Sequence, residues 1–310
     1  MISKPYLKGK KKVSRLGFGA WPLGNTSRGK TMTESEGIAL VRSAVEAGIT
    51  FFDTAPNYAD GRSETILGKA LEGIRKDVVI NTKFGHHADG TIDFDERRIR
   101  ASVLESLSRL RTTYLDSVIL HNPDRHVLEG KTGHFDELAK LKEEGLIHGY
   151  GVSIDTPEEL TLALKRNDID VIELLFNVFA QSARPLFEEV KRKNISLIIK
   201  VPLDSGWLSG AYHKDMVFTD IRSRWTAEDR ARRHALIDQV KALTGEAKLA
   251  KYALGFIWSY DAVTTVIPGI RTKTQLEEHI ASETFRFSDR LKAAFEALFD
   301  REIKHRPLPW

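Results

Sequence analysis

Short apolar segments alternate with helical sequence along nearly the whole chain, and this alternation constrains the fold more than any other feature. Several apolar segments are continuous runs, as expected of strands in a parallel sheet that is buried on both faces. A barrel of eight strand–helix units, the (β/α)8 or TIM barrel, satisfies the pattern best, and a doubly wound open sheet is the alternative. The predicted strands are Val13–Trp21 with its loop, Thr50–Asp53, Val78–Gly85, Tyr114–His121, Ile147–Ser153, Val171–Asn177, Ile195–Lys200 and Val263–Ile267.

Capping residues mark where several helices begin. Thr33 precedes Glu36 by three positions, which predicts a capping box at the start of the first helix. Thr156 is predicted to cap another helix, with Pro157 at its first position and Glu159 behind it. Two helices are predicted to close the chain, at Lys273–Ala281 and Ser288–Lys304.

Two segments fall outside the alternation of strands and helices. The first residues are predicted to form a short hairpin that turns near Lys8–Lys10. A long connection, Val201–Trp225, follows the seventh strand, and loops of this length are usually functional or disordered. Because no linker or low-complexity segment interrupts the chain, residues 1–310 are predicted to form a single domain that comprises the hairpin, the barrel and a C-terminal helix.

The composition limits the classes of partner. The formal net charge of +4 is small for 310 residues, and the basic run Lys8–Lys12 is interpreted as an exposed hairpin tip, because no aromatic residues are interleaved with it. The absence of cysteine excludes disulfides and thiolate catalysis. Neither a signal peptide nor a membrane span is found. A cytoplasmic protein with a small-molecule ligand is predicted, with no nucleic-acid or membrane partner and with no oligomeric state implied.

Polar residues stand at the ends of three consecutive predicted strands. Asp53, Lys83 and His121 occupy these ends, and Tyr58 lies on the loop after Asp53. In a parallel barrel these ends converge on the side where such barrels carry out chemistry. For Asp53 or Tyr58 alone, a turn cap or a surface aromatic is an equally good interpretation. Three polar strand ends together favour a functional site.

The four residue types suit a carbonyl group that must be polarised and then protonated. A free tyrosine has a pKa of about 10, and a neighbouring lysine ammonium lowers that pKa. A carboxylate keeps the lysine charged and oriented, and an imidazole supplies a further hydrogen bond to a substrate oxygen. No phosphate-binding glycine loop accompanies these residues. No metal is implied either, and the pair His86 and His87 is interpreted as a surface loop feature.

These residues and their surroundings resemble the aldo-keto reductase superfamily over essentially the whole chain. The matching stretches are Leu16–Trp21, Phe52–Tyr58, Asn81–Lys83, Leu115–Asp116, Leu120–His121, Gly151–Ser153, Pro202–Leu203, Ile267–Gly269 and Gln275–Glu278. The resemblance implies a (β/α)8 barrel that binds a nicotinamide cofactor in extended form, without a Rossmann domain. It also implies a catalytic tetrad in which Tyr58 donates a proton, Lys83 and Asp53 tune the tyrosine, and His121 orients the carbonyl.

The resemblance further implies a cofactor site, which departs in places from the common family pattern. Glu173 replaces a glutamine that helps to hold the nicotinamide carboxamide, and Lys200 replaces a tyrosine that stacks on the nicotinamide ring. Gln275 replaces an arginine near the adenosine phosphate, and Arg271 and Lys273 are expected to supply the missing charge. NADPH is therefore the expected cofactor, with NAD as the alternative. The implied cofactor-binding residues are Gly19, Ser153, Glu173, Lys200, Pro202, Leu203, Gly269, Arg271, Lys273, Gln275 and Glu278.

Three functions are compatible with this sequence. The leading one is the NADPH-dependent reduction of an aldehyde or ketone. The second is an NAD(P)-dependent dehydrogenase of sugars or other alcohols, which uses the same tetrad. The third is a regulatory subunit that binds the nicotinamide cofactor with slow turnover. Trp21 and Trp225 are candidate walls of the substrate site, and for Trp225 a packed loop anchor is an equal interpretation.

Overall fold

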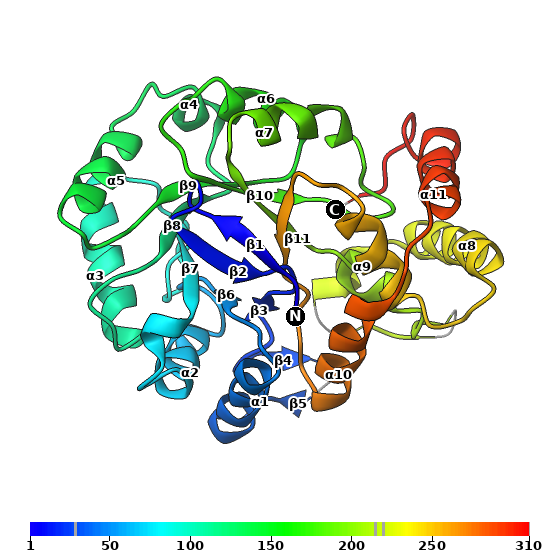
Figure 1. Ribbon diagram of the computed structural model, residues 1–310, viewed down its shortest axis with the longest axis horizontal. Helices are drawn as coiled ribbons and strands as arrows, with labels where there is room; N and C mark the ends of the chain where they lie inside the picture. The colour runs from blue at the N-terminus through cyan, green and yellow to red at the C-terminus, as the bar shows by residue number, and fades with distance from the viewer. Residues whose placement is uncertain (28–29, 214–215, 219–220, 310) are drawn as a thin grey trace.

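Parallel strands form a closed barrel with helices packed around it in the computed structural model, which describes residues 1–27, 30–213, 216–218 and 221–309 (Figure 1). The strands pair in sequence order, and the two ends of the sheet meet through bridges from Leu16 to Val266 and from Gly19 to Gly269. The predicted (β/α)8 barrel is therefore confirmed. Its strands are β3 (Phe18–Gly19), β6 (Phe51–Asp53), β7 (Val79–Phe84), β8 (Ser117–His121), β9 (Tyr150–Ile154), β10 (Val171–Leu175), β11 (Ser196–Lys200) and β12 (Val263–Val266).

Helices on the outside connect the strands, and short 3-10 turns lie between them. The capping box predicted at Thr33 and the helix cap predicted at Thr156 are both present, with each threonine oxygen accepting from the backbone N–H three residues further on. The helices are α1 (Glu34–Glu46), α2 (Arg62–Ala70), α3 (Ile99–Arg109), α4 (Arg125–Leu128), α5 (His134–Glu143), α6 (Pro157–Leu164), α7 (Phe187–Arg192), α8 (Ala227–Thr244), α9 (Ala250–Trp258), α10 (Lys273–Ala281) and α11 (Asp289–Glu302). Four of the 3-10 turns are η1 (Arg75–Asp77), η2 (Glu96–Arg98), η3 (Arg184–Leu186) and η6 (Ser282–Thr284).

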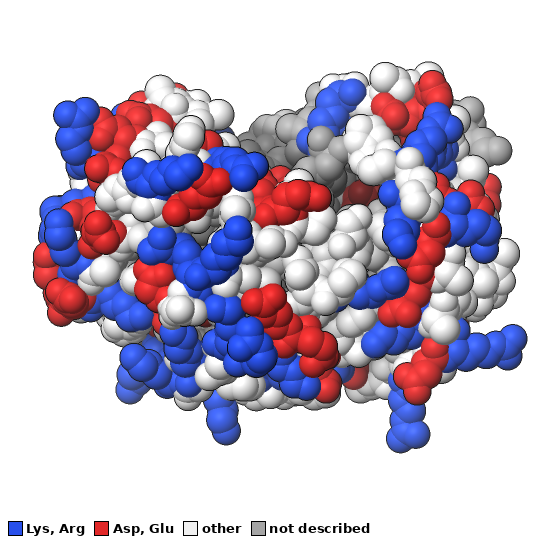
Figure 2. Space-filling model, turned by 90° about the horizontal axis from the view of Figure 1, so that it is seen from above, with Lys and Arg blue, Asp and Glu red and all other residues white. Residues whose placement is uncertain are grey.

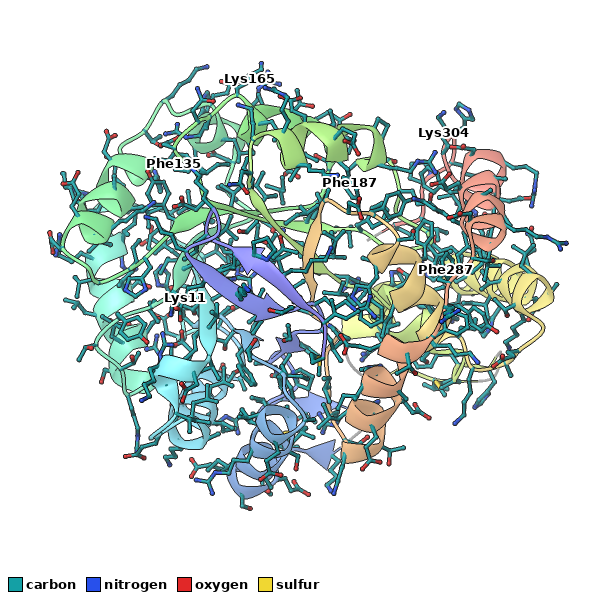
Figure 3. All side chains as sticks on the ribbon, in the orientation of Figure 1. Lys11, Phe135, Lys165, Phe187, Phe287 and Lys304 are labelled. Carbon is teal, nitrogen blue, oxygen red and sulfur yellow. The ribbon has the colours of Figure 1, made fainter. Side chains whose placement is uncertain are left out.

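Apolar side chains fill the space between the helices and the barrel. Phe135 on α5 and Phe187 on α7, both labelled in Figure 3, are buried there. Burying an aromatic or aliphatic side chain of this size stabilises the fold by roughly 1.5–3 kcal/mol. This packed layer makes the barrel a rigid frame for the loops at its mouth.

A hairpin covers the amino-terminal end of the barrel, as predicted. Strand β1 (Ser3–Tyr6) pairs with β2 (Lys11–Ser14), and the tip at residues 8–10 is exposed. Figure 1 shows the hairpin lying across the barrel opening. Because the hairpin closes this end, ligands must enter from the other end. Its inner residues Tyr6, Leu7 and Val13 join one apolar cluster with Phe51, Val79, Ile119, Val171, Ile198 and Ile267.

Strand geometry places polar side chains at the open end of the barrel. Successive residues of a strand point to opposite faces, so residues two apart share a face. Phe51 belongs to the cluster inside the barrel, and Asp53 follows it on the same face. The inward faces are therefore apolar near the hairpin and polar at the carboxyl ends of the strands. The same spacing relates Val79 to Asn81 and Lys83, Ile119 to His121, Val171 to Glu173, and Ile198 to Lys200.

The predicted long connection after β11 is present and contains only short turns in its described part. These turns are η4 (Asp204–Ser209) and η5 (Ile221–Arg224), and positions 214, 215, 219 and 220 lie outside the described residues. Val201, Asp204 and Ser205 have positive φ angles of 54°, 45° and 54°. Such backbone conformations cost a non-glycine residue about 1–3 kcal/mol each. The connection therefore carries strain where it borders the barrel mouth.

The surface carries charges of both signs. Figure 2 shows lysine and arginine side chains interspersed with aspartate and glutamate over the face in view, in keeping with the net charge of +4. A mixed surface of this kind produces no large field of one sign. Among the described residues, no helix is both long enough and apolar enough to cross a membrane.

Candidate active site

Asp53 and Lys83 form a buried ion pair at the mouth of the barrel. Lys83 Nζ donates to both carboxylate oxygens of Asp53, at 2.6 and 2.8 Å, and to the carbonyl oxygen of Thr54 at 3.0 Å. Each of the two charged residues is only 2% exposed. Burial lowers the pKa of Lys83, but the charges of Asp53 and Glu173 outweigh this effect and raise it above its ordinary value. The lysine is therefore charged and fixed in place.

A column of hydrogen bonds links Asp53 to the hairpin at the other end of the barrel. Asn81 Nδ2 donates to Asp53 Oδ2 at 2.7 Å, and Ser117 Oγ donates to Asn81 Oδ1 at 2.5 Å. Tyr6 Oη lies 2.6 Å from Ser117 Oγ. Because the single hydroxyl proton of Ser117 is directed at Asn81, Tyr6 is the donor in this last bond. The Asp53 carboxylate is thus oriented by Asn81 as well as by Lys83.

Tyr58 lies on the loop between β6 and α2, with its ring near Lys83. The Lys83 Nζ is 5.2 Å from the centroid of the tyrosine ring, and Tyr58 lines a cavity. Ala59, Asp60 and Gly61 have φ angles of 52°, 56° and 80°, which turn the chain sharply into α2. Burial raises the pKa of Tyr58, and the charge of Lys83 counteracts this only in part. The lowering expected from the lysine is therefore outweighed, and the phenol keeps its proton near pH 7.

His121, at the end of β8, stands between Tyr58 and a second imidazole. The His121 and His86 rings are stacked, with centroids 4.3 Å apart, and Tyr58 meets His121 edge-on at 6.3 Å. Burial, then the charge of Lys83, lowers the pKa of His121 well below its ordinary value. His121 is therefore neutral near pH 7. The interpretation of His86 as a surface loop feature misses its place beside this ring and in the cavity lining.

Glu173, on β10, adds a second buried carboxylate beside Lys83. Its Oε2 lies 3.5 Å from Lys83 Nζ, and its Oε1 accepts from Ser153 Oγ at 3.0 Å. Burial, then the charge of Glu173, raises the pKa of Asp53 to about 8, although Lys83 opposes the shift. Burial also raises the pKa of Glu173, but Lys83 and Lys200 outweigh it and lower the pKa. Because the carboxyls of Asp53 and Glu173 share the ammonium of Lys83, they take up a proton as a coupled pair and not as two independent groups.

Lys200, at the end of β11, is tied to the loops that follow β8 and β9. Its Nζ donates to Ser153 Oγ at 2.8 Å and to Asn122 Oδ1 at 3.0 Å, and it pairs with Asp155 at 2.8 Å. Asn122 Nδ2 in turn donates to Asp155 at 2.9 Å. The hydroxyl proton of Ser153 is used on Glu173, so this serine has no donor left for a ligand. Asn122 also lines the cavity, although the sequence analysis did not select it.

These side chains converge on a cavity of about 1250 Å³ at the carboxyl ends of the strands. Small-molecule sites typically measure about 300–1,000 Å³, so the cavity has room for an extended cofactor and a small substrate. Lys83 and Ser153 lie beneath its floor. The predicted site residues in its lining are Gly19, Trp21, Asp53, Tyr58, His121, Glu173, Lys200, Pro202, Leu203, Gly269, Arg271, Gln275 and Glu278.

A small hairpin that the sequence analysis did not predict borders the cavity through Lys30. Strands β4 (Thr26–Ser27) and β5 (Lys30–Thr31) pair antiparallel. The Arg271 guanidinium donates to the carbonyl oxygen of Asn25 at 3.0 Å and to that of Lys30, and so fastens the hairpin. Gln275 Oε1 accepts from the backbone N–H of Arg271 at 2.9 Å. Arg271 therefore lines the cavity while it supports the hairpin.

Besides Lys83 and Ser153, two predicted site residues lie outside the cavity lining of the described residues. Lys273 is exposed at the start of α10. Trp225 is 2% exposed and packs against Trp207, with ring centroids 6.0 Å apart. The Arg233 guanidinium covers the Trp225 ring at 4.4 Å and also donates to Asp204 of η4 at 3.1 Å. This placement corresponds to a packed anchor of the long connection.

The closed barrel with polar side chains at the carboxyl ends of its strands defines a (β/α)8 enzyme scaffold. Within this class, residues 15–299 match the aldo/keto reductase family, and the chain belongs to that family. The predicted family is therefore confirmed, and so is the predicted class of enzyme, a nicotinamide-dependent oxidoreductase.

Individual relatives agree with this assignment. The chain is 28% identical to L-galactose dehydrogenase of Arabidopsis thaliana over 291 residues, which cover 88% of this chain and 85% of the relative. It superposes on the holo form of an aldo-keto reductase of Bacillus halodurans with a TM-score of 0.81, at 24% identity and with 96% of each chain covered. An aldo/keto reductase of Klebsiella pneumoniae, solved in complex with NADP and acetate, gives a TM-score of 0.72 at 22% identity, with 96% of each chain covered. At these identities the two structures establish a common fold.

Proposed function

We propose that this protein reduces an aldehyde or ketone to the alcohol with NADPH, and that Asp53, Tyr58, Lys83 and His121 are its catalytic residues. The observation that carries the proposal is the convergence of a neutral phenol, a fixed ammonium and a neutral imidazole at one cavity. Positioned acid catalysis of this kind typically contributes about 10²- to 10⁴-fold in rate.

Tyr58 donates its proton to the carbonyl oxygen as negative charge develops there. The ammonium of Lys83 stabilises the phenolate that is left behind. Asp53 holds Lys83 charged and in place through the two short hydrogen bonds between them. His121, being neutral, donates one N–H to the same substrate oxygen and does not compete as a proton source.

The residues at the cavity fit a nicotinamide dinucleotide. Oε2 of Glu173 is buried without a hydrogen-bond partner in the described part of the chain, which suits the amide donor of a carboxamide. At the far end, Arg271 offers a guanidinium to a phosphate. A Cβ at Gly19 would lie 2.7 Å from the carbonyl oxygen of Ile267, so only glycine allows the strands to close here. When bound, NADPH supplies a hydride to the carbonyl carbon. The NADP complex of the Klebsiella relative supports this choice.

A second candidate is the oxidation of a sugar or another alcohol at the same site. It is favoured by the similarity to L-galactose dehydrogenase. The imidazole of His86 and the amide of Asn122 line the cavity beside His121 and suit a substrate with several hydroxyl groups.

The test is to assay the purified protein by nicotinamide absorbance with NADPH, NADP+, NADH and NAD+ against aldehydes, ketones and sugars. We expect turnover with NADPH and at least one carbonyl. Turnover only with sugars and an oxidised cofactor would favour the second candidate. Tight cofactor binding without turnover would contradict both and favour a regulatory nicotinamide-binding protein.

A further inference from the structure

Glu173 is a buried carboxylate whose charge the proposed reaction does not use. It is 2% exposed, and its Oε2 has no hydrogen-bond donor among the residues that the structure describes. Lys83 Nζ, at 3.5 Å, is beyond good hydrogen-bond distance and already donates to Asp53. A buried charge is costly unless a cation or hydrogen-bond donors compensate it. Above the pKa of about 8 for Asp53, where the carboxyl pair no longer shares a proton, compensation for Glu173 can come from the cavity that it lines.

The charges around the cavity floor do not balance. Lys83 is bound by Asp53 at 2.6 Å, and Lys200 is bound by Asp155 at 2.8 Å. Because both ammonium groups are engaged, Glu173 is a third carboxylate against two cations, and the floor carries one net negative charge once the pH exceeds the pKa of about 8 for Asp53. The other titratable groups that face the floor are neutral near pH 7. They are the phenol of Tyr58, whose pKa is raised, and the imidazoles of His86 and His121, whose pKa values are lowered.

The proposed reaction would bring a bound nicotinamide ring close to this floor. The substrate oxygen must lie within hydrogen-bond distance of Tyr58, and the reacting carbon approaches the hydride donor to about 3–3.5 Å. Lys83 Nζ lies 5.2 Å from the centroid of the Tyr58 ring and 3.5 Å from Glu173 Oε2, so a ring that meets this requirement would lie close to Glu173. The nicotinamide ring is positively charged when oxidised and uncharged when reduced, whereas the rest of the cofactor is unchanged.

We propose that Glu173 makes this protein bind the oxidised cofactor in preference to the reduced one. The inference rests on the proposed function and adds a property of its cofactor site.

The size of the effect follows from the charges. A unit charge about 5 Å from the Glu173 carboxylate, at an effective dielectric constant of about 20, favours the oxidised form by more than tenfold. Lys200 opposes this preference, because its ammonium is held 2.8 Å from the Ser153 hydroxyl that binds Glu173. Removing Glu173 and removing Lys200 therefore change the preference in opposite directions.

The experiment is to measure the dissociation constants of NADP+ and NADPH by titration calorimetry, without substrate. A pH of about 8.5 lies above the pKa of about 8 for Asp53, so most molecules have both carboxyls of the pair ionised. The variants are Glu173→Gln, which keeps the shape and removes the charge, and Lys200→Met. Glu64→Gln is the matched control, because Glu64 is equally buried but is held by Thr82 and Arg109 away from the cavity.

We expect Glu173→Gln to raise the ratio of the NADP+ to the NADPH dissociation constant at least tenfold, mainly through NADP+. We expect Lys200→Met to lower this ratio at least threefold and Glu64→Gln to leave it unchanged. A ratio within twofold of wild type in Glu173→Gln overturns the inference, as does equal weakening of both forms, and the reductase proposal then still stands. Failure of the wild type to bind either form overturns both proposals.

Discussion

Lys83 and Asp53 are joined by two hydrogen bonds, at 2.6 and 2.8 Å, deep in the barrel mouth. Neither side chain has solvent to replace its partner, because each is 2% exposed. The two residues therefore act as one unit, and removing Lys83 leaves Asp53 buried without its cation.

The first prediction follows from this pairing. Lys83→Met and Asp53→Asn should each lower kcat strongly, and the double variant should lose much less than the product of the two single losses, because the second change removes a charge that the first has left unpaired. Steady-state kinetics of the four proteins measures this coupling. Losses that simply multiply would show that the residues act independently.

The second prediction concerns the proton donor. Tyr58→Phe should lower kcat for carbonyl reduction by on the order of 10²- to 10⁴-fold and leave the NADPH dissociation constant within about threefold of wild type. Tyr114→Phe is the matched control, because Tyr114 stacks on His148 and lies outside the cavity lining. More than a tenth of wild-type kcat remaining in Tyr58→Phe would assign the proton to another group.

The third prediction is a fall in stability as the pH rises towards 8. The folded protein holds a proton on the carboxyl pair of Asp53 and Glu173 up to about pH 8. An unfolded aspartate loses it near pH 4. Between these values the folded state binds more protons, so the unfolding free energy falls with rising pH, by at most about 1.4 kcal/mol per unit for one proton. The lowered pKa of Glu173 acts below its ordinary range and does not oppose this fall.

Denaturant unfolding at several pH values between about 5.5 and 8.5 measures the slope. Glu173→Gln should flatten it, because the like charge that helps to raise the pKa of Asp53 is gone. Glu64→Gln should keep the wild-type slope. A wild-type stability that does not change over this interval would show that the carboxyl pair is fully ionised throughout.

The fourth prediction tests the strain in the connection after β11. Ser205 has φ 54° and ψ 24°, a left-handed conformation that glycine adopts without cost. Its carbonyl oxygen accepts from Tyr212 and Arg222, both at 2.8 Å, so the backbone is held there after substitution. Ser205→Gly should raise the unfolding free energy by about 0.5–1 kcal/mol. Ser209→Gly is the control and should lower it, because the Ser209 hydroxyl donates to Gly206 at 2.6 Å. Equal losses in both variants would mean that position 205 is unstrained.

The fifth prediction concerns cofactor choice. NADPH and NADH differ by a phosphate, and a guanidinium contributes roughly 1.5–3 kcal/mol for each hydrogen bond to such a group. Arg271→Ala should therefore weaken NADPH binding at least tenfold and hardly change NADH binding, whereas the exposed Lys273→Ala should have a small effect. Fluorescence titration with both cofactors measures this. Equal weakening of both would assign Arg271 to support of the β4–β5 hairpin alone.

Local patterns in the sequence were sufficient to predict the barrel and the strand ends. Continuous apolar runs mark buried parallel strands, and Asp53, Lys83 and His121 interrupt or end such runs, so their common location follows from the topology. The hairpin β4–β5 was not predicted, because strands of two residues have no periodicity to detect. Its position depends instead on Arg271, which is 240 or more positions away along the chain.

Contacts between side chains on different loops were also not predictable. His86 follows β7 and was interpreted as a surface residue, yet the course of its loop brings it onto His121. Trp225 could be a substrate wall or a packed anchor on sequence grounds, since both need a large aromatic residue. Only the positions of Trp207 and Arg233 show how its ring is packed.

The hydrogen bonds from Tyr6 through Ser117 and Asn81 to Asp53 all run in one direction. Each group donates towards the barrel mouth, so the dipoles add along the barrel axis and present their positive end to the carboxylate of Asp53. This row of dipoles has no net charge, but its orientation is fixed, and it extends from the hairpin to the active site. Loops transplanted onto this barrel from another enzyme would experience the electrostatic field of these dipoles. The same loops on a barrel without the hairpin would not.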